Sequence, residues 1–173
     1  MMKVIALAIL LLLLGSGCTA ETVWETVEDT LPPQQVSGWQ RQAYSIEAAM
    51  PQDAEFLGSN AEGSLYTVHD GAMEIQTARF LASDLDSAVK HLSGLRAEKL
   101  TVIQTTRFGL PEYQFGWYTV TEQGGRLCQA DLVMDGTCCY AVVTSVAEAE
   151  NKAYQEACRQ VFASFGLYFD EEV

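Results

Sequence analysis

The pattern of apolar and polar residues divides this chain into three parts. An unbroken apolar run, Val4 to Leu14, follows a single basic residue, Lys3. At about 1.5 Å per helical residue the run reaches about 17 Å, well short of the roughly 30 Å hydrocarbon core of a bilayer. Small residues follow at 15–17. This order is typical of a secretory signal peptide, and it predicts residues 1–17 as a cleaved signal.

A polar, acidic segment follows at 18–38 and contains Pro32-Pro33. Consecutive prolines favour an extended and semi-rigid backbone, which suits a tether between a membrane anchor and a folded domain. Apolar residues at near-helical spacing in 21–30 also allow a short helix that docks a partner.

Residues 39–169 show the alternation and turn signals of one folded domain, and an acidic tail follows at 170–173. Asp70-Gly71 and Asp135-Gly136 are strong hairpin-turn signals. The strands predicted on this basis are 44–48, 65–69, 73–81, 99–106, 112–121, 126–134 and 137–144.

Two helices are predicted within this domain. Ser83 caps the first helix, which ends at Gly94. The second begins at a capping box with Ser145 as N-cap and Glu148 three residues on. Its apolar face would pack on the sheet and consists of Tyr154, Cys158, Val161, Phe162 and Phe165. Because short turns join successive strands, we expect an α+β fold with a largely antiparallel sheet covered by helices.

The charge balance excludes one class of partner. Residues 18–173 carry nine basic and 23 acidic side chains, a formal charge of −14, because the tenth basic residue is Lys3. Such a surface repels phosphate backbones and anionic lipid headgroups. Nucleic acid is therefore a poor partner, and membrane attachment would depend on acyl chains rather than on charge.

The residues Gly15-Ser16-Gly17-Cys18 resemble the lipobox of bacterial lipoproteins, although Gly15 stands where the family usually has leucine. The resemblance implies a lipid on Cys18 and an anchor on the extracytoplasmic face of a cell membrane. The alternative is an ordinary secretory signal followed by a coincidental cysteine.

Several features of 42–167 occur together. They are an opening strand ending at Met50-Pro51, a hairpin before the helix at 84–93, the aromatic strand 113–118, the hairpin at 135–136 and a closing helix that runs into Ser164-Phe165. In this the chain resembles a PsbP-like domain, the α/β/α sandwich also seen in small Gram-positive lipoproteins. The resemblance implies a non-enzymatic binding or assembly role beside a membrane complex and supplies no site residue.

The sequence offers little catalytic chemistry. His69 lies at a hairpin turn beside Asp70, and His91 lies on the polar side of its helix, with no nucleophile near either in the inferred topology. Asp84 and Asp86 suit the positive end of a helix dipole better than a metal or carboxylate pair. Nucleophile, phosphate-binding, calcium-loop and zinc spacings are missing. We therefore expect no catalysis, no metal and no cofactor.

Tyr113, Phe115 and Trp117 alternate along one strand and therefore share a face. They are interpreted either as core beneath a helix or as a surface that stacks on a sugar or a peptide.

Four cysteines follow Cys18. A two-residue turn at 135–136 pairs Cys128 with Val143 and places Cys128 and Cys139 on the apolar face that meets a helix, too far apart along the strands to bond to each other. Two interpretations stay open: all four are free thiols, or Cys158 bridges to Cys128 or Cys139. Cys138, on the opposite face, is expected to be unpaired.

These observations favour a lipid-anchored, extracytoplasmic, non-catalytic binding or assembly module with a protein partner at the membrane surface. The alternative is a small solute- or glycan-binding lipoprotein that uses the row Tyr113, Phe115 and Trp117. A third class is an enzyme of unfamiliar type. An exposed aromatic cleft would favour the second, and a convergent cluster of buried titratable groups the third.

Overall fold

The computed structural model describes residues 44–168 and the backbone of a two-residue strand, β1 (Val23–Trp24). The predicted signal, Cys18, the acidic tail and most of the tether lie outside these residues. The other strands are β2 (Ser45–Glu47), β3 (Glu55–Ser59), β4 (Ser64–Val68), β5 (Met73–Leu81), β6 (Val102–Arg107), β7 (Leu110–Thr121), β8 (Gly124–Asp135), β9 (Cys138–Ala147) and β10 (Gly166–Tyr168). The α-helices are α2 (Leu85–Ser93) and α3 (Asn151–Ala163), and short 3₁₀ turns lie at Ala97–Lys99 and Glu148–Glu150.

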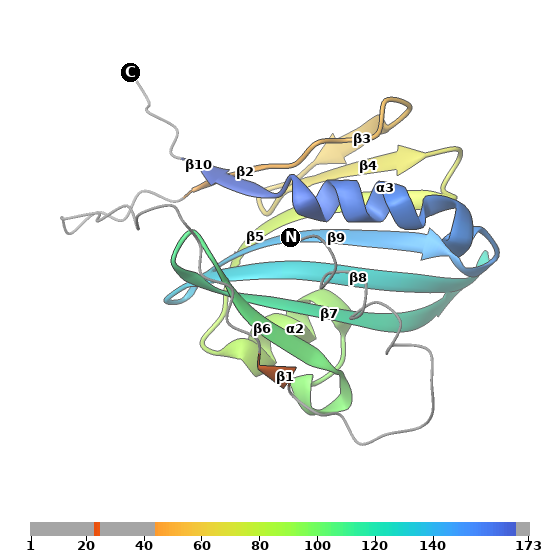
Figure 1. The fold of residues 1–173 in the computed structure, drawn as a ribbon. Helices are drawn as coiled ribbons and strands as arrows, with labels where there is room; N and C mark the ends of the chain where they lie inside the picture. Colours follow the sequence, from red (N-terminus) through yellow and green to blue (C-terminus); the bar gives the residue numbers. More distant parts are fainter. Residues whose placement is uncertain (1–22, 25–43, 169–173) are drawn as a thin grey trace, which may run out of the picture.

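One large sheet dominates the molecule (Figure 1). Its strand order is β1-β6-β7-β8-β9-β5-β4-β3, and every neighbouring pair is antiparallel except β1 with β6. Helix α2 packs on one face, while α3 and a two-stranded β2–β10 ribbon pack on the other. The predicted antiparallel sheet is confirmed. The structure is richer in sheet than a balanced α/β/α sandwich, because a single α-helix packs on each face in the described part of the chain.

The central strands are buried on both faces. Leu132 and Val133 are adjacent on β8, and each is 0% exposed, yet they belong to the hydrophobic cores on opposite sides of the sheet. Successive strand residues point to opposite faces, so a strand covered on both sides needs an apolar residue at nearly every position. This explains the continuous apolar runs of β8 and β9.

Helix α2 begins one residue later than the sequence predicted. Asp84, not Ser83, is its N-cap, and the Asp84 carboxylate accepts the backbone N–H of Ser87 at 2.8 Å. The hydroxyl of Ser83 donates to Asp84 instead of capping the helix. The predicted end is confirmed, since Gly94 is the C-cap with φ 74°, a conformation that favours glycine.

The predicted capping box of the last helix is wrong. Ser145 belongs to β9, where it pairs with Glu74 of β5 and its hydroxyl accepts a hydrogen bond from Arg126 Nε at 2.7 Å. Helix α3 starts only after the 3₁₀ turn. A local sequence motif contains no information about strand pairing, and the pairing of Ser145 in β9 outweighs its tendency to cap a helix. The predicted apolar face is confirmed, with Cys158 and Val161 buried against the sheet.

The β8–β9 hairpin is shifted from the predicted register. Cys128 pairs with Ser145 rather than Val143, because the turn is Gly136-Thr137 and Asp135 pairs with Cys138. The pairing partner on β9 shifts by two residues, so each side chain stays on the face of the sheet that was predicted for it. Strand β3 escaped prediction, because it lies at the edge of the sheet and lacks an alternating pattern.

Candidate functional site

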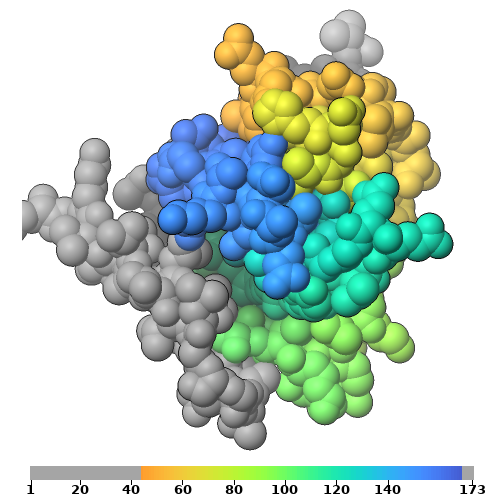
Figure 2. All heavy atoms as spheres, turned by 90° about the vertical axis from the view of Figure 1, so that its right-hand side faces the viewer, coloured from red at the N-terminus to blue at the C-terminus, as the bar shows by residue number. Residues whose placement is uncertain are grey.

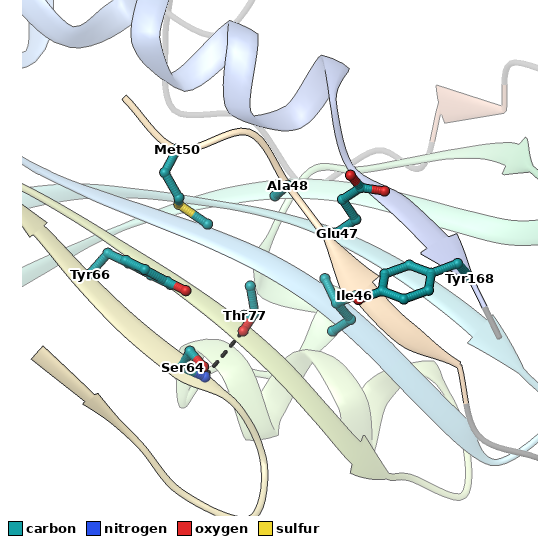
Figure 3. A pocket seen from close by; sticks show the side chains of 8 residues that line it. All are labelled: Ile46, Glu47, Ala48, Met50, Ser64, Tyr66, Thr77 and Tyr168. Atoms are coloured by element: carbon teal, nitrogen blue, oxygen red, sulfur yellow. Dashed lines mark hydrogen bonds between the residues drawn. The ribbon is translucent and has the colours of Figure 1, made fainter. Parts of the chain in front are cut away.

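A cleft opens between the β2–β10 ribbon and the part of the main sheet formed by β4 and β5 (Figure 3). Its volume is about 420 Å³, within the range of small-molecule sites. Its lining residues are Ile46, Glu47, Ala48, Met50, Ser64, Tyr66, Thr77 and Tyr168.

The ribbon that roofs this cleft is fixed to the rest of the fold. The Ser164 hydroxyl, at the end of α3, accepts the backbone N–H of Ala49 at 2.8 Å. The hydroxyl of Tyr140, a buried residue of β9, accepts the N–H of Tyr44 at 3.2 Å. Because both acceptors belong to elements packed in the core, the cleft is built into the fold and needs no ligand to form.

Two tyrosines reach into the cleft from opposite sides. Tyr66 projects from β4 and Tyr168 from β10, with their hydroxyls directed toward the space between them (Figure 3). Neither hydroxyl has a hydrogen-bond partner among the described residues. Phe56 lies 5.4 Å from Tyr66 between ring centroids and is 59% exposed, so it extends the aromatic surface toward β3.

The polar groups of the cleft are few. The hydroxyl of Thr77 accepts the backbone N–H of Ser64 at 3.1 Å on its floor. Glu47, on the ribbon, supplies the one charged side chain of the lining, and it is exposed and forms no ion pair within residues 44–168. A cleft with two tyrosine rings, apolar side chains and four hydroxyl groups can bind a small ligand.

A second constellation lies at the start of α3. His69 Nδ1 is 2.5 Å from the Tyr154 hydroxyl, and His69 Nε2 is 3.1 Å from Asp53 Oδ2. Figure 2 shows the β4–β5 turn (yellow) against the start of α3 (blue). The expectation that no nucleophile lies near His69 is therefore wrong, because Tyr154 carries a hydroxyl group. No local pattern indicates this contact, since the three residues are far apart along the chain.

This Asp53–His69–Tyr154 chain has the carboxylate–imidazole–hydroxyl order of a nucleophile-activating triad. Burial, Asp53 and Glu150 raise the pKa of Tyr154, which disfavours the reactive phenolate. The His69 side chain is 67% exposed, so water reaches it freely. The contacts therefore fasten the β4–β5 turn to α3 and to the loop before β3.

A cluster of buried charges lies on the α3 face of the sheet. The Arg107 guanidinium bonds to the Glu112 carboxylate, to Asp131 Oδ2 at 3.2 Å and to the backbone carbonyl of Phe165 at 2.6 Å. Burial, followed by the neighbouring Glu112, raises the pKa of Asp131 well above its usual value. None of these residues lines the cleft. The cluster joins the end of α3 to the sheet.

The acidic pair considered for a metal has structural partners. Asp84 caps α2, and Asp86 accepts the backbone N–H of Ala97 at 2.9 Å and pairs with Arg96 at 3.3 Å. No group of three or more metal-ligating side chains occurs between residues 44 and 168. His91 is exposed, as expected, and lies 3.3 Å from a carboxylate oxygen of Glu62.

The aromatic row of β7 faces the α2-side core. Phe115 is 5% exposed, and Tyr113 and Trp117 are partly buried against the same core. The centroids of Phe115 and Trp117 are 5.8 Å apart, and burial raises the pKa of Tyr113. The structure thus places this row away from the cleft, whose aromatic residues come from other strands.

The bridge considered between Cys139 and Cys158 does not suit this fold. Cys139 belongs to the core beneath α2 and Cys158 to the core beneath α3, so the sheet separates them. Cys128 shares the face of Cys139 and is likewise separated from Cys158. All three, with Cys138, are free thiols. The interpretation with a bridge assumed that α3 covers the face that carries Cys139, whereas α2 covers it.

Neither described helix is long and apolar enough to cross a bilayer. No protein-family model matches the chain, and no curated protein matches its sequence.

Solved structures match its fold. CyanoP, the cyanobacterial PsbP of Synechocystis sp. PCC 6803, is 11% identical with a TM-score of 0.50, over 78% of this chain and 98% of CyanoP. A protein of Bacteroides thetaiotaomicron is 11% identical with a TM-score of 0.50, over 73% of this chain and 46% of its own, so the chain spans about half of that protein. LpqN, involved in cell envelope biogenesis of Mycobacterium tuberculosis, is 12% identical with a TM-score of 0.49, over 75% of this chain and 86% of LpqN. With CyanoP matched along nearly its whole length, the chain has the PsbP-like fold that the sequence resemblance implied.

Proposed function

We propose that this chain is a non-catalytic binding module, anchored by a lipid on Cys18 to the extracytoplasmic face of a cell membrane, with the cleft beneath the β2–β10 ribbon as its binding site. The proposal rests on two polar groups in the cleft, the hydroxyls of two tyrosines. The hydroxyls of Tyr66 and Tyr168 point into a preformed cavity, and neither has a hydrogen-bond partner among the described residues.

The polar groups elsewhere support a role without catalysis. The Arg107 cluster and the Asp53–His69–Tyr154 chain are the two convergent sets of titratable side chains described above, and each connects elements of the fold. Neither lines the cavity in which a substrate would be enclosed. Acids and bases with perturbed pKa values take part in catalysis when they line the site that holds the substrate. Because neither set lines the cleft, their placement favours binding over catalysis.

The anchor is tested with Cys18→Ala. A fatty-acid analogue supplied to the expressing cells should label the wild-type chain, and the variant should be released or remain as an unprocessed precursor. Equal labelling of wild type and variant would refute the lipid on Cys18.

The cleft is tested with Tyr168→Ala. The full lipoprotein is treated in its native membrane with a mild crosslinker, and crosslinked products are compared by mass spectrometry. We expect a product of the wild type to be lost in Tyr168→Ala and kept in Tyr118→Ala. Tyr118 is a matched control, because it is 50% exposed, close to the 45% of Tyr168, and lies on β7. Equal products from both variants would exclude the cleft as the binding site.

A small neutral glycan is the second candidate for this cleft. The hydroxyls of Ser64 and Thr77 lie beside aromatic rings, and a sugar combines hydroxyl groups with an apolar ring face. This candidate keeps the solute-binding alternative but moves its site from the β7 row to the ribbon.

A further inference from the structure

We propose that one end of the fold, formed by α2, the 3₁₀ turn Ala97–Lys99 and β6, rests on anionic lipid headgroups through Lys90 and Lys99. The inference rests on the lipid anchor of the proposed function, and it adds the surface that faces the membrane. It also turns the cleft, at the opposite end of the sheet, away from the bilayer.

Strand β1 shows where the chain from the anchor meets the fold. It pairs with β6 at one edge of the main sheet, and the pairing is parallel, with Val23 beside Ile103. The anchor side of β1 therefore lies at the start of β6, which follows the turn Ala97–Lys99 by two residues. Cys18 precedes Val23 by five residues, and an extended chain spans at most about 3.6 Å per residue, so the lipid lies within about 18 Å of Val23.

The charges of the fold are distributed unevenly between this end and the rest. Residues 84–107, from the N-cap of α2 to the end of β6, carry four basic and three acidic side chains. The remainder of 44–168 carries four basic and 13 acidic side chains. Because Arg107 bonds within the buried cluster, the exposed charges of 84–107 cancel. An anionic membrane repels the acidic remainder, so it orients the fold with this end toward the lipid even though the net charge is negative.

The acidic groups at this end have partners within the fold. Asp84 caps α2, and Asp86 accepts the N–H of Ala97 and pairs with Arg96, which also lies 3.7 Å from Glu98. The bonds of Asp86 fix the turn Ala97–Lys99 to α2. The helix and the turn therefore present their exposed side chains as one surface.

Lys90 and Lys99 are the cations of this surface that remain available. Both are exposed, and neither forms an ion pair within residues 44–168. Leu95, in the turn between α2 and Arg96, is 39% exposed and adds an apolar side chain beside them. Ammonium groups bind anionic headgroups, and their aliphatic stems together with Leu95 suit the apolar boundary below.

The cleft lies at the other end of the sheet. Five strand spacings separate β6 from β4, which at about 4.8 Å each makes about 24 Å. Figures 1 and 2 show the segment of α2 and β6 (green) at one end of the molecule and β3 and β4 (orange and yellow) at the other. Contact of the α2 end with lipid therefore leaves the cleft open to a partner that approaches from outside the membrane.

The experiment measures which end of the fold lies against the lipid. The mature lipoprotein is reconstituted into vesicles of phosphatidylcholine with phosphatidylglycerol, or of phosphatidylcholine alone, each with a trace of lipid that carries a nitroxide quencher on its headgroup. A fluorophore is attached at Leu95→Cys or, as the matched control, at Leu57→Cys, an exposed position on β3. Cys138→Ser is included in both, because Cys128, Cys139 and Cys158 are buried. We expect strong quenching at position 95 and little at position 57 in the anionic vesicles, and a smaller difference in phosphatidylcholine alone.

Variants connect the orientation to the two lysines. Each lysine near an anionic membrane shifts the equilibrium of contact by about fivefold, so Lys90→Gln/Lys99→Gln should lose most of the difference between the two positions. Arg79→Gln/Lys152→Gln is the matched control, because it removes the same charge from two exposed cations, on β5 and α3, that form no ion pair within residues 44–168. The control should keep the difference.

The outcomes separate this inference from the proposed anchor. Equal quenching at positions 95 and 57 in anionic vesicles, with Cys18 still labelled by the fatty-acid analogue, would refute the headgroup contact and keep the anchor; the lysines would then suit an acidic protein surface instead. Stronger quenching at position 57 would place the opposite end against the membrane. A difference that survives Lys90→Gln/Lys99→Gln, or that the control variant loses equally, would refute the two lysines as the contacts. A wild-type chain that dissociates from both kinds of vesicle on dilution would refute the anchor, and the inference with it.

Discussion

Replacing Arg107 by Met should destabilise the fold strongly, because Arg107 holds two carboxylates and the end of α3 together. Its side chain is 19% exposed, and those of Glu112 and Asp131 are 5% and 2% exposed. Methionine keeps much of the aliphatic stem but removes the bonds to both carboxylates and to the Phe165 carbonyl. Removing one partner of a buried ion pair costs about 3–5 kcal/mol, because the other charge stays buried.

We expect about 3 kcal/mol, the lower end of that range. Burial and Glu112 already raise the pKa of Asp131, and removing the Arg107 cation raises it further, so uptake of a proton relieves part of the uncompensated charge in Arg107→Met. A loss of this size is a large fraction of the 5–15 kcal/mol that stabilises a typical domain. The double variant Arg107→Met/Glu112→Gln should therefore recover part of the loss.

The assay is urea unfolding of the mature chain, followed by circular dichroism, with the free energy of unfolding taken from the linear extrapolation. Arg159→Met is the matched control, because Arg159 is 67% exposed and pairs with Glu156 on the surface of α3. It should change stability by less than about 0.5 kcal/mol. A loss below about 1 kcal/mol in Arg107→Met, or no recovery in the double variant, would refute the reasoning.

Three further predictions concern other buried groups. The pKa of Asp131 is raised in the folded state, so its contribution to the free energy of unfolding is greatest below the unfolded pKa of about 3.8 and is lost as pH rises through the folded pKa. Asp131→Asn should therefore become more stable relative to wild type with rising pH. Parallel pH profiles of the two proteins in urea unfolding would contradict this. Gly63→Ala should lower the melting temperature markedly, because its Cβ would lie 1.8 Å from the backbone oxygen of Thr77, and an unchanged melting curve would show that the chain relaxes there. Iodoacetamide should modify the partly exposed Cys138 well before Cys139, whose pKa burial raises to about 11, and mass spectrometry of the native protein after timed alkylation would show a reversed order if this is wrong.

The sequence by itself determined the features that depend on neighbouring residues. Alternation in 73–77 indicated β5 and the face that carries Met73 and Ile75, because strand side chains repeat every two residues. Asp70-Gly71 marked a hairpin, and Gly94 marked the end of α2, because few residues other than glycine adopt positive φ readily. The apolar spacing of Tyr154, Cys158 and Val161 specified the face of α3 that packs on the sheet, wherever that helix began.

Only the tertiary structure decided where these elements meet. Ser145 satisfies a local helix-start motif, yet it remains in β9 because Arg126 and the neighbouring strands bind it there. The faces of β9 were predictable, but which helix covers which face was not, and this separates Cys139 from Cys158.

The candidate site belongs to the same class of features. The ribbon that roofs the cleft depends on a hydrogen bond between Ala49 and Ser164, 115 positions apart, and on another between Tyr44 and Tyr140, 96 positions apart. Sequence periodicity depends only on residues that are close together along the chain. Contacts over such separations form only when the whole sheet has folded, so the cleft with Tyr168 in its wall became visible only in three dimensions.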